Sequence, residues 1–516
     1  MAKSKFENFL KYIVLVIFGV IVLGLFMMST GATSVMDGEE NIYATGDSKL
    51  KHIVILLVVL GIGTFVKSKH FRFLQLKNAK KFLGVMTLLN VGLLAGWIGL
   101  TQFAPTLDQN SIMQAAANLV QHNAADWARG NYMYLYPFQN GMVLFEYLIT
   151  VLFGENQYIL LQLLNIPFLA LSIFAISRIF KLMFRSESIA NWIYLLLPVW
   201  LPFSAYITFI YGTIPGFCLS MFAILFVYLY FDKRKFWYLA VGGVCMAAAI
   251  IFKSNYLIFM VALVIAILLD WIHTFDHKVL LGAVLMVLLY AGATMGVNAI
   301  TERLSGVETP QGIPKMAWVA MGIGDDRMYG WWNGYNIYVY SKNDYDYKAA
   351  KEESNGKVLG RLELFAEKPR YAASFFKKKV DSIWNNPTFQ SFHIQTTRES
   401  DIELSGFVQD VIQEEGTANR ILMEVLNILQ TLVLAGTLLY IVLYWKQSTT
   451  YQMIFAIIFI GGFLFQLAWE AKCQYTVYFF YLLIPYAVVG WNRAFGWTEE
   501  WIMKRKGKSE DVQEGI

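Results

Sequence analysis

Residues 256–272 read YLIFMVALVIAILLDWI, a run whose only charged side chain, Asp270, lies near its end. A helix needs roughly 20 mostly apolar residues to cross a bilayer core about 30 Å thick. Because lipid offers the backbone no hydrogen-bond partner, an apolar run of this length in a membrane must be helical. The stretch therefore predicts a transmembrane helix.

Runs of the same kind recur along the chain, which is 57% hydrophobic and only 15% charged. An ordinary soluble chain carries about 25% charged residues. We therefore predict an all-α polytopic membrane protein with about twelve crossings. They are expected at residues 11–29, 52–66, 82–103, 158–180, 190–209, 213–231, 237–252, 256–272, 279–298, 421–445, 452–468 and 475–491.

Lysine and arginine placement sets the orientation, because cytoplasmic loops are enriched in both. Twelve crossings place most basic groups on one side: Lys3, Lys5, Lys11, the segment 67–81, Arg178, Lys181, Arg185, Lys233, Arg234, Lys235, Lys446, Arg493, Lys504, Arg505 and Lys506. A further crossing at 137–153, which is also apolar, would break this agreement. We expect 137–153 to lie on or dip into the outer leaflet, both termini to be cytoplasmic, and the first crossing to be a retained membrane anchor.

This topology divides the chain into segments. Residues 1–81 form two N-terminal helices with a basic cytoplasmic loop, and 82–298 form a transmembrane core with an outer loop at 104–157. An extracytoplasmic domain at 299–420, C-terminal transmembrane helices at 421–491 and a cytoplasmic tail at 492–516 follow. Three scattered cysteines support no disulfide framework or cysteine metal site. The chain has no glycine-rich nucleotide loop, zinc-protease motif or nucleophile elbow, so cytosolic nucleotide chemistry is not expected.

Asp108 is the first candidate for chemistry. It follows the third predicted crossing by a few residues, so its carboxylate is expected at the membrane surface, where it could take a proton from a hydroxyl. The alternative is that Asp108 caps the helix expected to begin near Asn110, since aspartate is a favoured N-cap. An aromatic belt at the interface would likewise explain the tyrosines of the same loop and Pro137.

Other polar residues fall on the same outer side, in short turns between crossings. Lys253 and Lys472 both depart from the inside bias of basic residues, and an outer lysine can bind the phosphate of a lipid head group. Snorkelling of a long side chain to the interface is the alternative for either lysine.

These features together resemble the GT-C glycosyltransferases. The resemblance is carried by TLDQ at 106–109, YLYPFQNG at 134–141, YGTIPG at 211–216, FKSN at 252–255, GIPK at 312–315 with Trp318 and MG at 321–322, and WNNPT at 384–388. The chain is most similar to the branch containing protein mannosyltransferases and aminoarabinose transferases, of the Gram-positive type. It departs from that branch in having Gln109 after Asp108, where paired acids are frequent, and in carrying two extra helices in front.

The resemblance implies transfer of a sugar from a polyprenyl-phosphate carrier to an acceptor hydroxyl on the outer face, with inversion. Asp108 would be the general base, and Lys253 and Lys472 would stabilise the departing phosphate. The substrate-binding residues are expected to be Gln109, Tyr136, Asn140, Tyr211, Lys253, Asn255, Glu470, Lys472 and Tyr475. No metal ligand is assigned and no cofactor is expected, although a divalent cation is possible. The acceptor would be a cell-wall polymer, a glycolipid or a protein, and nucleic acid is not an expected partner.

The outer segment 299–420 holds further candidates. Residues 369–384 predict an amphipathic helix suited to the membrane surface. Trp318, Trp331, Trp332 and Tyr335 could stack on sugar rings or pack in a core. Asp325 and Asp326 could form a second carboxylate site or a solvated turn.

Two other functions fit the helix count. A transporter or lipid flippase would be expected to show repeated halves and charges near the bilayer midplane, neither of which is evident in the sequence. A scaffold or sensor would tolerate Asn at position 108, whereas an enzyme requires the carboxylate.

Overall fold

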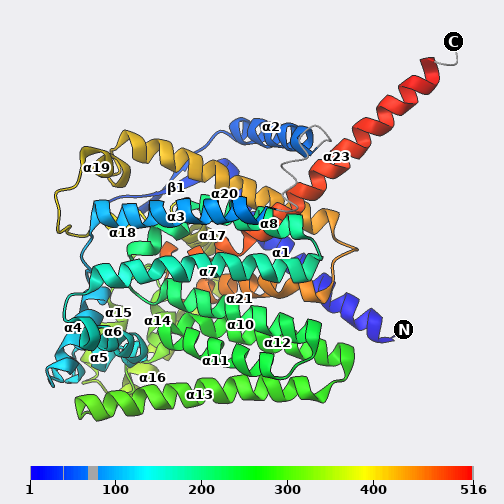
Figure 1. The fold of residues 1–516 in the computed structure, drawn as a ribbon. Helices are drawn as coiled ribbons and strands as arrows, with labels where there is room; N and C mark the ends of the chain where they lie inside the picture. Colours follow the sequence, from blue (N-terminus) through cyan, green and yellow to red (C-terminus); the bar gives the residue numbers. More distant parts are fainter. Residues whose placement is uncertain (1, 39, 68–78, 514–516) are drawn as a thin grey trace.

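Long helices running side by side make up most of the molecule in the computed structural model, which describes residues 2–38, 40–67 and 79–513 (Figure 1). Both ends of the chain lie at the same end of this bundle. The long helices are α1 (Ala2–Gly31), α2 (Lys49–Lys67), α3 (Lys80–Thr101), α7 (Tyr158–Phe184), α10 (Thr213–Lys233), α11 (Trp237–Phe252), α12 (Leu257–Thr274), α13 (His277–Ser305), α20 (Thr417–Leu443), α21 (Ile454–Ala468) and α23 (Leu483–Gln513).

Nine helices of the described residues are long and apolar enough to cross a membrane, and a bent pair raises the number to ten. The pair spans α8 (Glu187–Leu196) with η4 (Leu197–Val199), then α9 (Leu201–Ser204) with η5 (Ala205–Thr208), and its halves meet at 63°. It corresponds to the predicted crossing at 190–209. The predicted crossing at 237–252 is α11, whose 16 residues span about 24 Å. The predicted crossing at 475–491 is divided among η9 (Cys473–Tyr475), α22 (Val477–Tyr481) and the start of α23.

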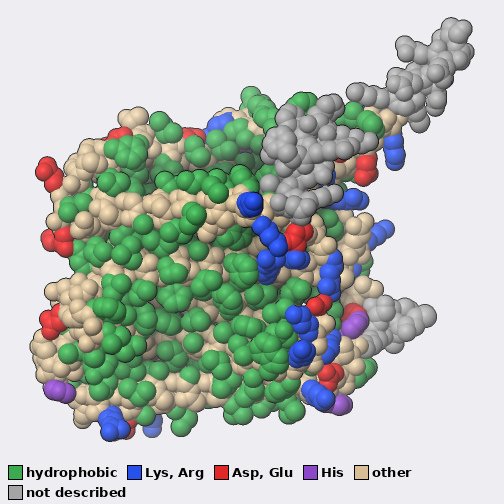
Figure 2. Space-filling model, viewed as in Figure 1, with side chains coloured by type: hydrophobic (Ala, Val, Ile, Leu, Met, Phe, Trp, Pro, Cys, Tyr) green, Lys and Arg blue, Asp and Glu red, His purple; other side chains and the backbone are tan. Residues whose placement is uncertain are grey.

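Large apolar side chains cover the outside of these helices. Leu57 on α2 is 62% exposed, Leu93 on α3 is 74% exposed and Leu288 on α13 is 62% exposed. Figure 2 shows a broad hydrophobic surface on one face, with most of its lysine and arginine side chains toward the end where the termini lie. Such a surface requires lipid as its solvent. The prediction of an all-α polytopic membrane protein is confirmed.

The loop after α3 folds into short helices at the end of the bundle opposite the termini (Figure 1). They are α4 (Asp108–Val120), η2 (Ala125–Trp127), α5 (Tyr132–Leu135), η3 (Pro137–Gln139) and α6 (Asn140–Phe153). Helix α6 has 14 residues and a length of about 21 Å, and it is not among the described helices that are long and apolar enough to cross a membrane. This agrees with the expectation that 137–153 is not a crossing.

The segment 299–420 contains α14 (Lys315–Gly322), η7 (Met328–Gly330), α15 (Tyr335–Lys342), α16 (Tyr347–Glu367), α17 (Pro369–Trp384), α18 (His393–Thr396) and α19 (Gly406–Ile412). Helix α17 corrects one expectation. The predicted helix forms, but its C-terminal half is buried in protein, with Lys379 and Ile383 at 0% exposure and Trp384 at 1%. It packs against α16, α21 and α1 and does not lie along the membrane surface.

Two of the tryptophans that could have stacked on sugars are packed in the interior. Trp331 is fully buried and donates a hydrogen bond from Nε1 to Ser382 Oγ at 3.1 Å. The Trp318 ring stacks on Trp469, with the ring centroids 5.7 Å apart. Asp325 accepts a hydrogen bond from the Tyr371 hydroxyl at 2.7 Å, and Asp326 pairs with Lys357 at 2.6 Å. The two carboxylates thus stabilise the surface of this segment.

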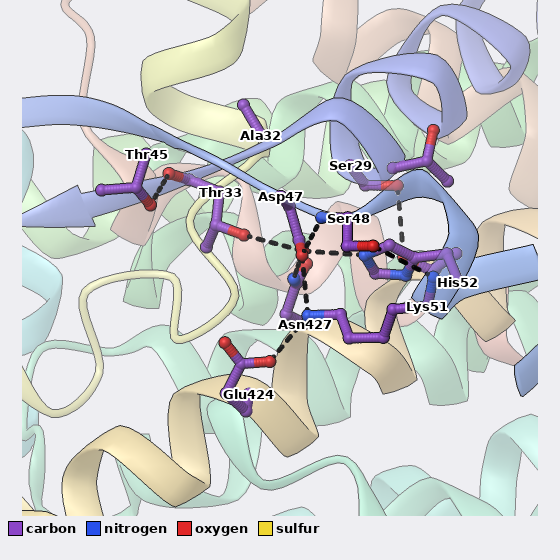
Figure 3. A network of polar contacts seen from close by, with 12 residues as sticks. Ser29, Ala32, Thr33, Thr45, Asp47, Ser48, Lys51, His52, Glu424 and Asn427 are labelled. Atoms are coloured by element: carbon purple, nitrogen blue, oxygen red, sulfur yellow. Dashed lines mark hydrogen bonds and ion pairs between the residues drawn. The ribbon is translucent and has the colours of Figure 1, made fainter.

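A short antiparallel hairpin, β1 (Ala32–Met36) and β2 (Ile42–Gly46), connects α1 to α2. Asp47, at its base, is the centre of a polar network that reaches α20 (Figure 3). Its carboxylate lies 2.7 Å from Lys51 Nζ and 2.7 Å from His52 Nε2, and it also accepts a hydrogen bond from Asn427. Lys51 pairs in turn with Glu424 at 2.7 Å. The network fixes the hairpin and the start of α2 to α20.

Candidate active site

The backbone directly before Asp108 has an unusual conformation at Leu107. Leu107 has φ 50° and ψ −127°, a conformation that leucine rarely adopts and that concentrates at functional sites. It occupies the N-cap position of α4 and makes no side-chain capping bond, and Asp108 is the first helical residue. The Asp108 carboxylate accepts a hydrogen bond from the Tyr211 hydroxyl at 3.2 Å. The alternative that Asp108 is an N-cap is therefore not realised.

Tyr211 connects Asp108 to the rest of the outer loop. Its hydroxyl accepts a hydrogen bond from Gln139 Nε2 at 2.6 Å while it donates to Asp108. Burial, reinforced by the charge of Asp108, raises the pKa of Tyr132 well above its ordinary value. Burial, reinforced by the charge of Asp108, raises the pKa of Tyr211 well above its ordinary value, so its hydroxyl remains a donor.

Lys253 comes from a different turn and faces the same tyrosine. It follows α11, and its ammonium lies 4.5 Å from the centre of the Tyr211 ring and 5.9 Å from that of Tyr475. Its Nζ donates to Thr213 Oγ1 at 3.1 Å. Burial lowers the pKa of Lys253 to about 7, although the charge of Asp108 opposes the shift. The amine is thus poised to gain a full charge when an anion approaches.

Gly212 makes this approach possible. Its φ is +70°, and a Cβ atom there would lie 2.2 Å from the Phe252 carbonyl oxygen. Only glycine lets the turn before α10 contact the end of α11 so closely. Tyr211 and Lys253 are brought together by this backbone contact.

Glu470 adds a second carboxylate from the turn between α21 and α22. It is 4% exposed, and burial raises its pKa to about 7. Lys472 and Lys379 favour its ionisation, whereas the charges of Asp108 and Glu40 oppose it. The charge of Asp108 thus acts on Glu470, and Tyr136 and Tyr475 each lie in the field of both carboxylates.

The remaining residues expected at the site hold its walls together. Gln109 Oε1 accepts from the Ile210 amide at 2.9 Å and from Arg398 at 3.0 Å. Asn140 accepts from Trp127 Nε1 at 3.3 Å, and Asn255 donates to the Tyr478 hydroxyl at 3.2 Å. Lys472 lies 3.8 Å from Glu40. Contact of these four residues with substrate stays a prediction.

Two buried cations at the site were not expected from the sequence. Arg398 donates to Thr208 and Gln109 and so positions the residue after Asp108. Lys379 donates to the backbone carbonyls of Gly322, Leu467 and Trp469, and thereby holds the turn that carries Glu470. No periodic pattern distinguishes either from exposed basic neighbours, because their partners are distant in sequence.

An apolar groove of about 510 Å³ lies between α11 and α13, beside these polar residues. Its lining residues are Val244, Ala247, Ala248, Ile251, Phe252, Leu288, Leu289, Gly292 and Ala293. Val244 and Leu288 are 56% and 62% exposed, so the groove borders the lipid-facing surface. It reaches Phe252, the residue directly before Lys253. Within the described residues, no group of three or more His, Cys, Asp or Glu side chains could hold a metal ion.

No protein-family model and no curated protein matches this chain. Among solved structures it is similar to the archaeal oligosaccharyltransferase AglB from Archaeoglobus fulgidus, whose structure holds an inhibitory peptide and a dolichol-phosphate. The TM-score is 0.42 and the identity 11%, over 85% of this chain and 52% of that one. The chain thus spans about half the length of that protein, and its own residues carry the functional proposal that follows.

Proposed function

We propose that the protein is a membrane glycosyltransferase that moves a sugar from a polyprenyl-phosphate carrier to an acceptor hydroxyl. The observation that carries this proposal is the convergence of Asp108, Tyr211, Lys253 and Glu470 from four separate segments, beside an apolar groove. A carboxylate base and a cation next to a lipid-facing groove are what a lipid-linked donor requires.

The reaction is a single displacement. Asp108 accepts the proton of the acceptor hydroxyl as that oxygen attacks the anomeric carbon, and the bond from this carbon to the carrier phosphate breaks. The sugar is transferred with inversion, and the carrier leaves as polyprenyl phosphate. Positioned general bases typically contribute about two to four powers of ten in rate. Tyr211 orients Asp108 through the 3.2 Å hydrogen bond.

Lys253 receives the phosphate. A cation placed where negative charge develops stabilises the transition state more than the ground state. An isoprenoid tail in the groove between α11 and α13 would end at Phe252 and so bring its phosphate to Lys253. Lys472 is proposed as a second phosphate contact.

We place this reaction on the outer face of the cell membrane, with both termini in the cytoplasm. Helix α4, which begins with Asp108, lies at the end of the bundle opposite the termini, whereas the lysine and arginine side chains visible in Figure 2 gather toward the terminal end. The positive-inside rule then assigns the terminal end to the cytoplasm. The acceptor would be a cell-wall polymer, a glycolipid or a protein.

The test is sugar transfer by purified protein in liposomes, with a panel of labelled polyprenyl-phosphate hexoses and pentoses. We expect one donor to be consumed, and Asp108→Asn to lower the rate by about a hundredfold or more because the base is missing. Asp126→Asn is the matched control, since Asp126 lies in the same loop and accepts a hydrogen bond from Asn118 Nδ2 at 2.8 Å. Full activity of Asp108→Asn would remove Asp108 from catalysis. A wild-type protein that consumes no donor would favour a transporter or lipid flippase instead.

A further inference from the structure

The hairpin between the two N-terminal helices contacts segments that lie more than 300 residues later in the chain. The Ser34 amide donates to the Asn385 carbonyl at 3.2 Å, and Asn386 Nδ2 donates to the Ser34 carbonyl at 3.0 Å. Asn385 Nδ2 donates to the Ala32 carbonyl at 2.8 Å. Strand β1 is therefore held by the loop after α17.

The tip of this hairpin directs Glu40 at the turn that carries Glu470 and Lys472. Asp37 closes the tip by accepting from the Asn41 amide at 2.8 Å, and Glu40 has φ 61°. Glu40 Oε1 accepts from Gln390 Nε2 at 3.0 Å, and Gln390 is 1% exposed. Glu40 Oε2 lies 3.8 Å from Lys472 Nζ. The carboxylate is thus fixed on one side and paired on the other.

Charged groups from several elements meet around this pair. Glu470 lies in the fields of Lys472, Asp108, Glu40 and Lys379. His393, on α18, lies in the fields of Glu40, Asp37 and Lys472, and its Nδ1 is 3.7 Å from Glu414. Lys472 therefore pairs with Glu40 and also acts through its charge on Glu470.

We infer that Glu40 is a positioning residue that holds the Lys472 ammonium beside Glu470. The Glu40 carboxylate also competes with an incoming phosphate for this ammonium. The N-terminal helix pair thereby contributes a side chain to a site otherwise built from later segments. This inference rests on the proposed function in taking the carrier phosphate as the anion that Lys472 meets.

The inference predicts opposite effects on binding and turnover. Without the Glu40 carboxylate, a phosphate has one competitor fewer for Lys472, and the site has one negative charge fewer. A phosphate should therefore bind more tightly. The product, polyprenyl phosphate, carries the same anion, so its release should become slower. A variant that merely loosened the fold would weaken binding and turnover together.

The experiment measures farnesyl phosphate binding and donor turnover by Glu40→Gln in liposomes, with Glu40→Asp as the conservative variant. We expect Glu40→Gln to bind farnesyl phosphate about three- to tenfold more tightly and to lose kcat by a similar factor, as removal of a nearby like charge predicts. Glu40→Asp should recover most of both values. The control is Glu424→Gln, which removes an exposed carboxylate on α20 that pairs with Lys51 at the start of α2. Unchanged or weaker binding by Glu40→Gln would overturn the inference.

A second readout does not depend on the proposed activity. Labelling of Lys472 by an amine-specific reagent, followed by mass spectrometry, should be several-fold faster in Glu40→Gln than in wild type and unchanged in Glu424→Gln. If wild type neither binds farnesyl phosphate nor consumes a donor, the proposed function fails, and the labelling still decides the role of Glu40. Equal labelling of Lys472 in wild type and Glu40→Gln would show that Glu40 does not hold it.

Discussion

Lys253 and Glu470 have opposite charges when ionised, and burial brings the pKa of each to about 7. Lys253 is charged below this pH and Glu470 above it. Asp108 favours the charged form of Lys253, and Lys472 and Lys379 favour that of Glu470, but burial outweighs these charges. Perturbed groups of this kind concentrate at functional sites.

The pH dependence of phosphate binding should follow Lys253. As pH rises through about 7, the amine loses its proton and its attraction for the carrier phosphate. A guanidinium has a much higher pKa than an amine, so Lys253→Arg should keep its charge to higher pH and the loss of affinity should move upward. Farnesyl phosphate binding measured from pH 6 to 9 checks this, with exposed Lys351→Arg as control. An unchanged pH profile in Lys253→Arg would contradict it.

At the scale of residues, the sequence identified Asp108 but left its role open. Its position after a crossing indicated the membrane surface, whereas a helix beginning nearby favoured capping when Asp108 was considered alone. Whether Asp108 caps the helix depends on the backbone of Leu107. Its φ of 50° cannot be predicted from the presence of a leucine in the sequence. Lys253 could be singled out because it departs from the inside bias of basic residues. Arg398 could not, because its partners Thr208 and Gln109 lie 190 and 289 residues away.

At the scale of elements, α17 shows why an amphipathic pattern can mislead. Three consecutive lysines at 377–379 indicated a helix with a basic, solvated face. Two of them are exposed, but Lys379 is fully buried and bonds three carbonyls. The amphipathic pattern shows only which residues are polar. Lys379 can be buried because α14 and the end of α21 supply carbonyl groups that accept its hydrogen bonds.

Replacement of this lysine should destabilise the protein. Lys379→Met leaves the Gly322, Leu467 and Trp469 carbonyls without their shared donor, which should cost about 2–4 kcal/mol. Lys377→Met, on the exposed face of the same helix, should change the free energy of unfolding by less than about 0.5 kcal/mol. Thermal unfolding in detergent measures both. Equal stability of the two variants would show that the buried bonds contribute nothing net.

The hairpin network gives a second prediction for an element. Burial opposes ionisation of Asp47, but the hydrogen bonds from Lys51, His52, the Ser48 amide and Asn427 outweigh it and hold its pKa well below the ordinary value of 3.8. A depressed carboxyl pKa contributes stability that is present above the unfolded-state pKa and is lost as pH falls toward the folded-state value. Asp47→Asn should therefore cost about 1–3 kcal/mol at pH 7.

The difference between wild type and Asp47→Asn should diminish as the pH falls below about 4. Unfolding midpoints in detergent at pH 7 and pH 3.5 give the comparison. The exposed Glu424 of the same network is the control, since its pair with Lys51 should be worth less than about 1 kcal/mol. A difference that grows on acidification would contradict this account of Asp47.

At the scale of the whole molecule, composition and apolar runs predicted the fold class, because every lipid-facing helix must satisfy its own backbone and cover itself with apolar side chains. The number of spans was harder to predict. Helix α11 is short for a crossing, and the pair from α8 to η5 bends by 63°. Contacts between distant segments, such as the hairpin with residues 385–386, leave no trace in local periodicity.

The orientation can be tested on intact cells. A cysteine at Lys351, exposed on α16, should react with a membrane-impermeant maleimide, whereas one at Lys235, exposed in the turn before α11, should react only after permeabilisation. Cys218 and Cys473 are buried and Cys245 is partly buried, so the unsubstituted protein supplies the background. The reverse labelling pattern would place the site around Asp108 on the cytoplasmic side.

The hairpin between α1 and α2 also has a consequence for biosynthesis. Its partners at 385–386 are translated about 350 residues later, which takes roughly 20–70 s at about 5–20 residues per second. Strand β1 and the buried side of α1 must wait through that interval without the loop and helices that will cover them. This early-translated hairpin is therefore among the last elements to reach its native contacts, and a ribosome that stalls before residue 385 leaves a product in which the hairpin has no loop to contact.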